Sequence, residues 1–242
     1  MQIKVLRDVL EQDSEFADRI RSDLARRGIL ALNLISGPGA GKTSLLERTL
    51  ERLEGRLRVA VIEGDIATSL DAERVSRKGI EVVQLNTGGA CHLEAKLVVR
   101  GYEALDLDGV DLLLIENVGN IACPAEFDLG EDVKVALVSV AEGHDKPAKY
   151  PLLFHEAGCF VLNKIDLGPY VDFDRDLFTR ALRGLNRAAP LLPVSCRTGE
   201  GLEAWIDWLD ATLRAKREGR LAPPPFAHRH EHGERWGHTH AR

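Results

Sequence analysis

The stretch SGPGAGKTS (residues 36–44) follows directly on the apolar run 29–35 and decides the fold class. In such a loop, small residues let backbone N–H groups curl around a phosphate, a lysine reaches the β and γ oxygens, and a hydroxyl ligates Mg²⁺ at the start of a helix. Ser36 stands where the usual pattern has glycine, and Gly37 and Gly39 still leave the loop free to turn. The sequence therefore predicts a phosphate-binding loop for a nucleoside triphosphate. The nucleotide contacts expected here are Gly37, Pro38, Gly39, Ala40, Gly41, Lys42, Thr43 and Ser44.

Apolar segments typical of strands alternate with helical patterns along the rest of the chain. Strands that are apolar almost throughout indicate a parallel sheet with both faces covered. We therefore expect an α/β fold with a doubly wound, mostly parallel sheet, helices on both faces, and the architecture of P-loop NTPases. The expected strands are 30–35, 58–62, 81–85, 110–115, 133–140, 159–162 and 191–194, and the expected helices include 5–27, 92–105 and 202–217.

Base specificity is indicated by Asn163-Lys164-Ile165-Asp166, which follows the expected strand 159–162. The Asp166 carboxylate can accept hydrogen bonds from N1–H and the exocyclic amine of guanine, whereas adenine offers no matching pair of donors, so we expect discrimination against ATP of about 10³-fold. Asn-Lys after a strand is also ordinary turn chemistry, and the distance from the phosphate loop favours base recognition. We expect GTP and GDP to be the ligands. The base-site residues are Asn163, Lys164, Asp166, Ser195, Cys196 and Arg197.

Two carboxylates at expected strand ends, Asp65 and Glu116, are candidates to hold Mg²⁺ together with Thr43. Magnesium takes few direct protein carboxylates and keeps several waters, so one can bind directly and the other through water. Gly119 can offer a backbone N–H to the γ-phosphate. We expect catalysis to use Lys42, Asp65 and Gly119, the alternative for each carboxylate being a solvated loop residue.

A second metal site is suggested by Cys91 and His92, at the start of the expected helix 92–105, and by Cys123. A cysteine at a helix N-terminus has its thiolate stabilised by the helix dipole, and thiolates with an imidazole suit Zn²⁺ or Ni²⁺. From spacing alone, buried structural residues remain the more frequent explanation. We also expect weak metal binding by the histidines of the C-terminal tail, which are His228, His230, His232, His238 and His240.

Composition narrows the class of protein. The 242 residues are 44% hydrophobic with a formal net charge of −6, which argues against nucleic acid or an anionic membrane surface as a partner. No stretch has membrane-spanning length and residues 1–10 lack the apolar core of a secretory signal, so we expect a cytoplasmic protein. The expected organisation is an amphipathic helix (1–28), a GTPase domain (29–221) and a disordered Pro/His-rich tail (222–242).

From residue 29 to residue 209 the chain resembles the HypB family of hydrogenase nickel-incorporation GTPases. The matching segments are specific, and a generic GTPase shares only the phosphate loop and N-K-x-D. These segments are Leu32-Asn33-Leu34, Val61-Ile62-Glu63-Gly64-Asp65, Asn86-Thr87-Gly88 with Cys91-His92-Leu93, Glu116-Asn117-Val118-Gly119-Asn120 with Cys123-Pro124, and Glu142-Gly143-His144-Asp145-Lys146-Pro147 through Lys149-Tyr150-Pro151.

This resemblance implies a SIMIBI-class GTPase that dimerises with nucleotide and binds nickel or zinc through Cys91, His92 and Cys123. It also implies a metallochaperone that delivers nickel during maturation of [NiFe]-hydrogenase, with the hydrogenase large subunit or another accessory protein as partner. One departure is that the chain begins Met1-Gln2-Ile3-Lys4, without the cysteine-rich motif or the histidine-rich stretch that some members carry ahead of the phosphate loop.

Two other functions fit parts of the pattern. A urease-type nickel accessory GTPase also combines a phosphate loop with Cys/His ligands, although the segments around Cys91 and Cys123 argue against it. A nickel-storage protein would bind metal through its histidine-rich tail. The favoured hypothesis is a GTP-gated donor, because Cys123 follows Gly119 by four residues, so that departure of the γ-phosphate could displace a metal ligand.

Overall fold

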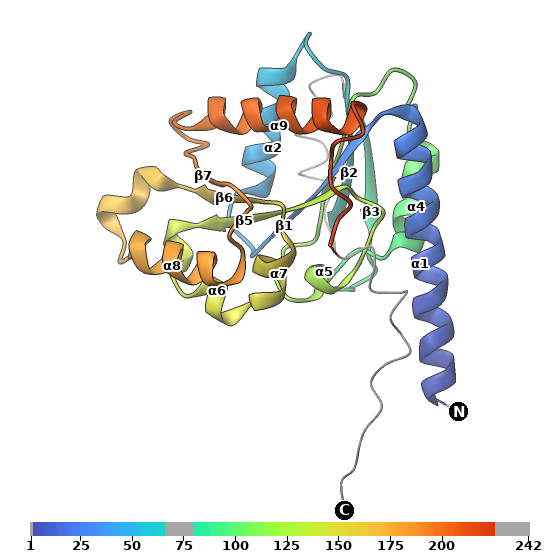
Figure 1. Cartoon of the computed structure of the whole chain (residues 1–242), viewed down its shortest axis with the longest axis horizontal. Helices are drawn as coiled ribbons and strands as arrows, with labels where there is room; N and C mark the ends of the chain where they lie inside the picture. Colours follow the sequence, from blue (N-terminus) through green and yellow to red (C-terminus); the bar gives the residue numbers. More distant parts are fainter. Residues whose placement is uncertain (1, 66–79, 226–242) are drawn as a thin grey trace, which may run out of the picture.

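The computed structural model describes residues 2–65 and 80–225, with the side chains of 13–64 and 80–225 (Figure 1). In this part of the chain every strand belongs to one parallel sheet, in the order β3-β2-β4-β1-β5-β6-β7. The expected α/β fold with a doubly wound parallel sheet is confirmed. The strands are β1 (Leu30–Ser36), β2 (Val59–Asp65), β3 (Glu81–Asn86), β4 (Leu112–Glu116), β5 (Val133–Ser139), β6 (Cys159–Asn163) and β7 (Leu191–Pro193).

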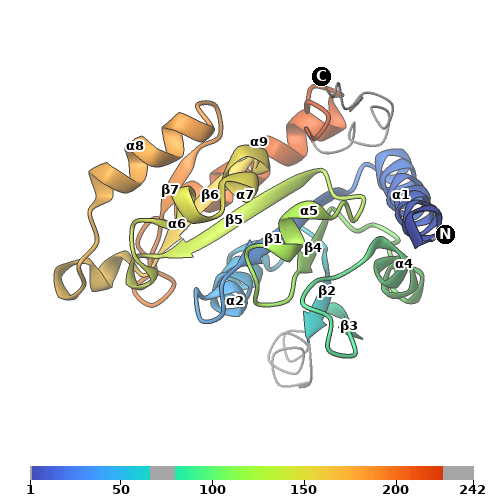
Figure 2. The ribbon, with the colours of Figure 1, turned by 90° about the horizontal axis from the view of Figure 1, so that it is seen from below.

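Helices cover both faces of the sheet. Two helices, α2 and α9, share a core with one face, and α1, α4, α7 and α8 pack on the other. In Figures 1 and 2, α1 and α4 lie side by side at one end of the sheet and α8 lies at the other. The helices are α1 (Gln2–Arg27), α2 (Lys42–Leu53), α4 (Ala95–Ala104), α5 (Cys123–Glu126), α6 (Lys146–Lys149), α7 (Pro151–Glu156), α8 (Arg175–Leu185) and α9 (Leu202–Arg217), with 3₁₀ turns η1 (Val140–Glu142) and η2 (Ile165–Tyr170).

Strand β1 is the central strand, and its sequence shows why the sheet is covered on both sides. Leu30, Leu32 and Leu34 pack against α2 and α9, whereas Ala31 packs in the core beneath α1 and α4. Every residue of β1 is buried, so an alternating apolar and polar pattern would leave polar groups without water on one face. The run before the phosphate loop is therefore apolar except for Asn33, whose side chain has hydrogen-bond partners in the interior.

Helix α1 packs onto the body of the molecule through its C-terminal half. Ile20 and Leu24 are fully buried in the core shared with α4, and Arg21 Nη2 donates to Asp128 Oδ2 at 2.6 Å.

The division into a helix 1–28, a GTPase domain 29–221 and a tail 222–242 stays a prediction, and residues 226–242 lie outside the described part of the chain. None of the helices within 2–65 and 80–225 is both long enough and apolar enough to cross a membrane.

A buried ion pair joins β5 to α7. Lys134 Nζ donates to Glu156 Oε2 at 3.0 Å and to the Ala125 carbonyl at 2.7 Å, and both charged side chains are almost fully buried. The lysine thereby also holds the last turn of α5, the helix that begins at Cys123. Removing one member of such a pair leaves the other charge buried and unpaired in a low-dielectric interior, which destabilises the fold.

We expect Lys134→Met to lower the free energy of unfolding by about 3–5 kcal/mol, because the cation beside the buried Glu156 carboxylate is lost. Urea unfolding followed by circular dichroism measures the change. The double variant Lys134→Met/Glu156→Leu should recover much of the loss, and Arg19→Ala, which breaks an exposed pair with Glu103, should cost less than about 1 kcal/mol. Equal losses in the single and double variants would contradict this account.

Candidate functional site

The phosphate loop lies between the end of β1 and the start of α2. Gly41 caps the helix at φ 105° and Gly39 has φ 73°, both in the left-handed region that favours glycine. Lys42 Nζ donates to Ser36 Oγ at 3.0 Å. The serine at the first loop position thus holds the lysine that is expected to contact the phosphates.

The segment 163–166 closes over the loop from the end of β6. Asn163 Nδ2 donates to the Ala40 carbonyl at 2.9 Å, and Lys164 Nζ donates to the Gly39 carbonyl at 2.6 Å. A Cβ atom on Gly41 would lie 2.4 Å from Asn163 Nδ2, so only glycine lets the two segments come this close. Lys164 itself has φ 60°, a conformation that non-glycine residues adopt infrequently. The predicted base motif and phosphate loop therefore form one packed unit.

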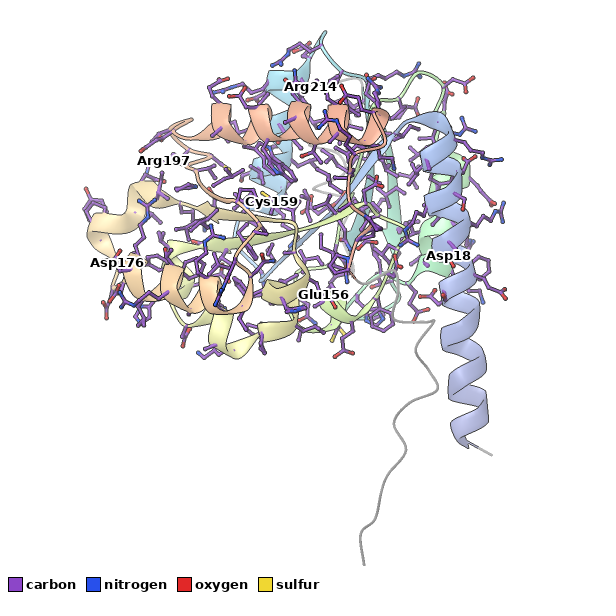
Figure 3. The ribbon with its side chains drawn as sticks, in the orientation of Figure 1. Asp18, Glu156, Cys159, Asp176, Arg197 and Arg214 are labelled. Atoms are coloured by element: carbon purple, nitrogen blue, oxygen red, sulfur yellow. The ribbon has the colours of Figure 1, made fainter. Side chains whose placement is uncertain are left out.

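The predicted base-recognition residues come together at the ends of β6 and β7. Ser195 Oγ donates to Asp166 Oδ1 at 2.6 Å, and the Cys196 N–H donates to Asn163 Oδ1 at 3.2 Å. Burial raises the pKa of the Cys196 thiol to about 11, so the thiol is neutral at pH 7. Arg197 is exposed at the edge of the molecule, away from the buried Cys159 (Figure 3).

A cavity of about 390 Å³ opens beside the loop at the carboxyl ends of the strands. Thr43 Oγ1 donates to Glu116 Oε1 at 2.9 Å within it, which places two of the three predicted magnesium residues in contact. Gly119 adjoins the loop, since a Cβ there would lie 3.4 Å from Pro38 Cα. Asp65 is the last residue of β2, and its side chain lies outside the described residues.

Glu63 is a site residue that the sequence reasoning missed. It lines the same cavity from β2 and is 3% exposed. Glu63 lies two positions before Asp65 in the sequence, and side chains alternate between the two faces of a strand, so this spacing could have indicated Glu63 as a second candidate.

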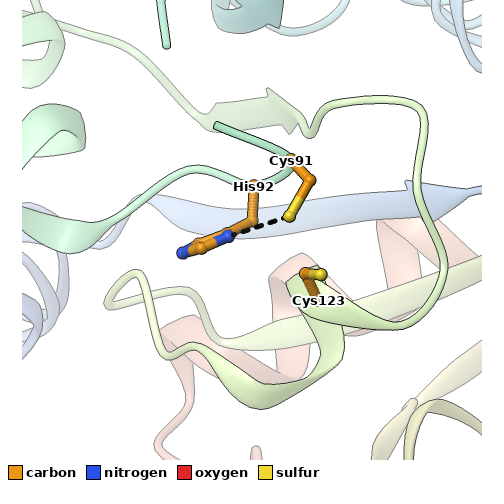
Figure 4. Close-up of side chains that lie close together, drawn as sticks. All are labelled: Cys91, His92 and Cys123. Carbon is orange, nitrogen blue, oxygen red and sulfur yellow. Dashed lines mark hydrogen bonds between the residues drawn. The ribbon is translucent and has the colours of Figure 1, made fainter. Parts of the chain in front are cut away.

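The structure brings Cys91, His92 and Cys123 together (Figure 4). Their ligand atoms all lie within 4.8 Å of one another, and Cys91 Sγ is 3.7 Å from His92 Nδ1. Two sulfurs and an imidazole nitrogen are the donors that suit nickel or zinc. The His92 ring stacks on Phe127 with centroids 3.8 Å apart, and its buried Nε2 has no hydrogen-bond partner among the described residues. The cluster fits a bound ion. The C-terminal histidines predicted as weak ligands lie outside the described residues.

The expected helix beginning at His92 is wrong, because α4 begins at Ala95. The Leu93 N–H donates to Asn117 Oδ1 at 3.2 Å, and its buried side chain packs against Gly64, which keeps this segment out of the helix. Cys91 therefore lies in a bend ahead of α4, and the helix-dipole argument does not apply to it. Cys123 does begin a short helix, yet its pKa is raised, first by the hydrogen bond with the Cys91 thiol and then by burial, while Asn120 acts in the opposite direction.

A buried network of polar side chains begins at Asn117, on the segment between Glu116 of the predicted magnesium site and Cys123 of the cysteine–histidine cluster. Asn117 Nδ2 donates to Asn33 Oδ1 at 3.2 Å, and Asn33 Nδ2 donates to Glu131 Oε1 at 3.0 Å. All three side chains are at most 1% exposed. Burial, followed by the nearby Asp128 charge, raises the pKa of the Glu131 carboxyl to about 6. The network fixes Asn117 and hence the Leu93 backbone next to His92.

Comparison with known proteins decides the family. The CobW/HypB/UreG nucleotide-binding domain matches residues 31–193, and hydrogenase maturation factor HypB of Escherichia coli K12 is 46% identical over 203 residues, covering 84% of this chain and 70% of the relative. The chain belongs to the HypB family.

The crystal structure of HypB from Archaeoglobus fulgidus is of a chain 38% identical in sequence to this one, with a TM-score of 0.79, and the match covers 84% of this chain and 100% of that one. The chain in the crystal structure of HypB from Helicobacter pylori in complex with nickel is 32% identical in sequence to this one, with a TM-score of 0.80, and the match covers 87% of this chain and 98% of that one. The resemblance to HypB P-loop GTPases is confirmed.

The raised pKa of Glu131 predicts a pH-dependent stability. The folded pKa of about 6 exceeds the ordinary 4.5, so this carboxyl stabilises the fold fully below pH 4.5 and loses that contribution as the pH rises through 6. Relative to Glu131→Gln, the wild-type chain should lose about 2 kcal/mol of unfolding free energy between pH 4.5 and 7. Urea unfolding at both pH values measures it, and a difference independent of pH would argue against the assignment.

Asp166→Ala should lower GTP affinity by about 10³-fold and leave ATP affinity nearly unchanged, because the carboxylate is expected to pair with donors that only guanine presents. Titration with fluorescent nucleotide analogues measures both affinities. Ser195→Ala serves as the control: it removes one hydrogen bond to Asp166 while keeping the carboxylate, so its effect should be about tenfold. Parallel losses of GTP and ATP binding would exclude base recognition by Asp166.

Proposed function

We propose that this chain is a GTP-hydrolysing metallochaperone that binds nickel, or zinc, and delivers nickel during maturation of [NiFe]-hydrogenase. The observation that carries the proposal is the short segment 117–123, which adjoins the phosphate loop at Gly119 and carries the thiol of Cys123. Membership of the HypB family and the nickel complex of the Helicobacter pylori relative support it. We place this activity in the cytoplasm, with neither nucleic acid nor membrane as a partner.

Hydrolysis would use residues already gathered at the loop. Lys42 would contact the β and γ oxygens, and Thr43 and Glu116, with Asp65, would hold Mg²⁺, which neutralises the developing phosphate charge when bound. The existing hydrogen bond from Thr43 to Glu116 supports this pairing. The Gly119 N–H would face the γ-phosphate, and the Asp166 carboxylate, in the segment that begins at Asn163, would hold the base.

Cargo binding would use Cys91, His92 and Cys123. Three protein ligands leave a tetrahedral site incomplete, and a second copy of the chain related by twofold symmetry can supply the missing donors. A nucleotide- and metal-linked homodimer is therefore part of the proposal. The recipient would be the hydrogenase large subunit or an accessory protein that passes nickel to it.

The predicted consequence is that nickel affinity differs between the GTP and GDP states, since loss of the γ-phosphate contact at Gly119 would shift Cys123. We expect at least a fivefold difference, a typical coupling between linked sites. Competition with a chromophoric chelator, in the presence of a non-hydrolysable GTP analogue or GDP, measures it on the full chain.

A chain truncated before Pro223 provides the control, because it retains Cys91, His92 and Cys123 and lacks the histidine-rich tail. It should keep the nucleotide-dependent site, whereas Cys123→Ala should lose it. Equal affinity in both nucleotide states would overturn gating, and loss of most bound nickel on truncation would favour a storage protein.

A further inference from the structure

Asn120 contacts the phosphate loop and both cysteine-bearing segments at once. Its backbone forms an isolated antiparallel bridge with Ser36, the residue that accepts the Lys42 hydrogen bond. Its side chain contacts the backbone of Cys91 and of Ala122, the residue before Cys123. The residue therefore spans the two candidate sites without an intermediary.

The side-chain amide uses its donor and its acceptor for different segments. Nδ2 donates to the Cys91 carbonyl at 3.4 Å, and Oδ1 accepts the Ala122 N–H at 3.0 Å, just before α5. The amide carries its donor and its acceptor on two separate atoms, whereas the carboxylate of an aspartate of the same shape only accepts.

Gly119 and Ile121 adjoin the phosphate loop. A Cβ on Gly119 would lie 3.4 Å from Pro38 Cα, and a Cβ on Gly37 would lie 3.4 Å from Ile121 Cδ1. We expect a displacement of the loop, when its ligand changes, to reach residues 119–121 through these neighbours and through the Ser36–Asn120 bridge. Asn120 would pass that movement to the Cys91 carbonyl and to the start of α5.

We propose that Asn120 is the positioning residue that couples the state of the phosphate loop to the separation of the Cys91 and Cys123 thiols. This assignment rests on the proposed function, in which nucleotide and metal are linked. It predicts that the amide sets the difference in nickel affinity between nucleotide states.

Asn117 provides a contrast on the same segment. Its side chain holds the Leu93 backbone to Asn33 in the interior. The residue lines the cavity beside the phosphate loop, but none of the described hydrogen bonds of its side chain reaches residues 37–41. It should support the geometry of the metal site in the same way whichever nucleotide is bound. Its loss should weaken nickel binding in both states and leave their ratio intact.

The test measures nickel dissociation constants by chelator competition, with a non-hydrolysable GTP analogue and with GDP, for the full-length wild type and variants. In Asn120→Ala the ratio of the two constants should fall to within about twofold of unity, with affinity for the GTP analogue changed less than about threefold. Asn120→Asp keeps an acceptor for Ala122 and loses the donor to Cys91, so its ratio should fall as well. Asn117→Ala should keep the wild-type ratio.

Amide hydrogen exchange of residues 91–93 in the two nucleotide states gives a second readout that needs no metal. A nucleotide-dependent difference in the wild type should disappear in Asn120→Asp. A wild-type affinity ratio of one would overturn both the gated function and this assignment. A wild-type ratio above fivefold that persists in Asn120→Ala and Asn120→Asp would overturn the assignment of Asn120 alone.

Discussion

The backbone bridge between Ser36 and Asn120 is the contact on which the arrangement of this molecule depends. It joins the end of β1, where the phosphate loop begins, to the segment that leaves β4 and carries Cys123. Because both strands are parallel and adjacent, their carboxyl ends emerge at the same edge of the sheet. A loop for phosphate and a cluster of soft metal donors can then share one stretch of backbone only a few residues long.

Close packing around that bridge explains several residue choices. Gly41 lets Asn163 reach the phosphate loop, and Gly64 makes room for Leu93, whose backbone is held by Asn117. Where a side chain packs this closely on the backbone, a Cβ atom would force the segments apart. Glycine at these positions therefore allows the segments around both sites to pack at these distances.

Buried polar groups add specificity at an energetic cost. Asn33, Asn117 and Glu131 form a hydrogen-bonded chain in the interior, and Lys134 pairs with Glu156 beneath α5. Each group must find its partner, since a buried polar atom left unsatisfied costs about 1–3 kcal/mol. These interactions favour a single placement of the segments that carry His92 and Cys123. Local sequence gave no sign of them, because a lone asparagine in an apolar strand does not reveal its partner.

The sequence by itself determined the fold class, the phosphate loop and the candidate ligands, because periodic burial and the chemistry of Ser36 to Ser44 are local properties. The strand positions were predicted to within a few residues for the same reason. The start of α4, the placement of Glu63 and the contacts of Asn117 and Asn120 depended on the tertiary structure. They follow from contacts between segments distant in sequence: Leu93 is drawn out of a helix by a residue 24 positions away. Hydrogen bonds of this kind are set by how the strands are ordered in the sheet, and only the folded chain brings Cys91 and His92 to Cys123.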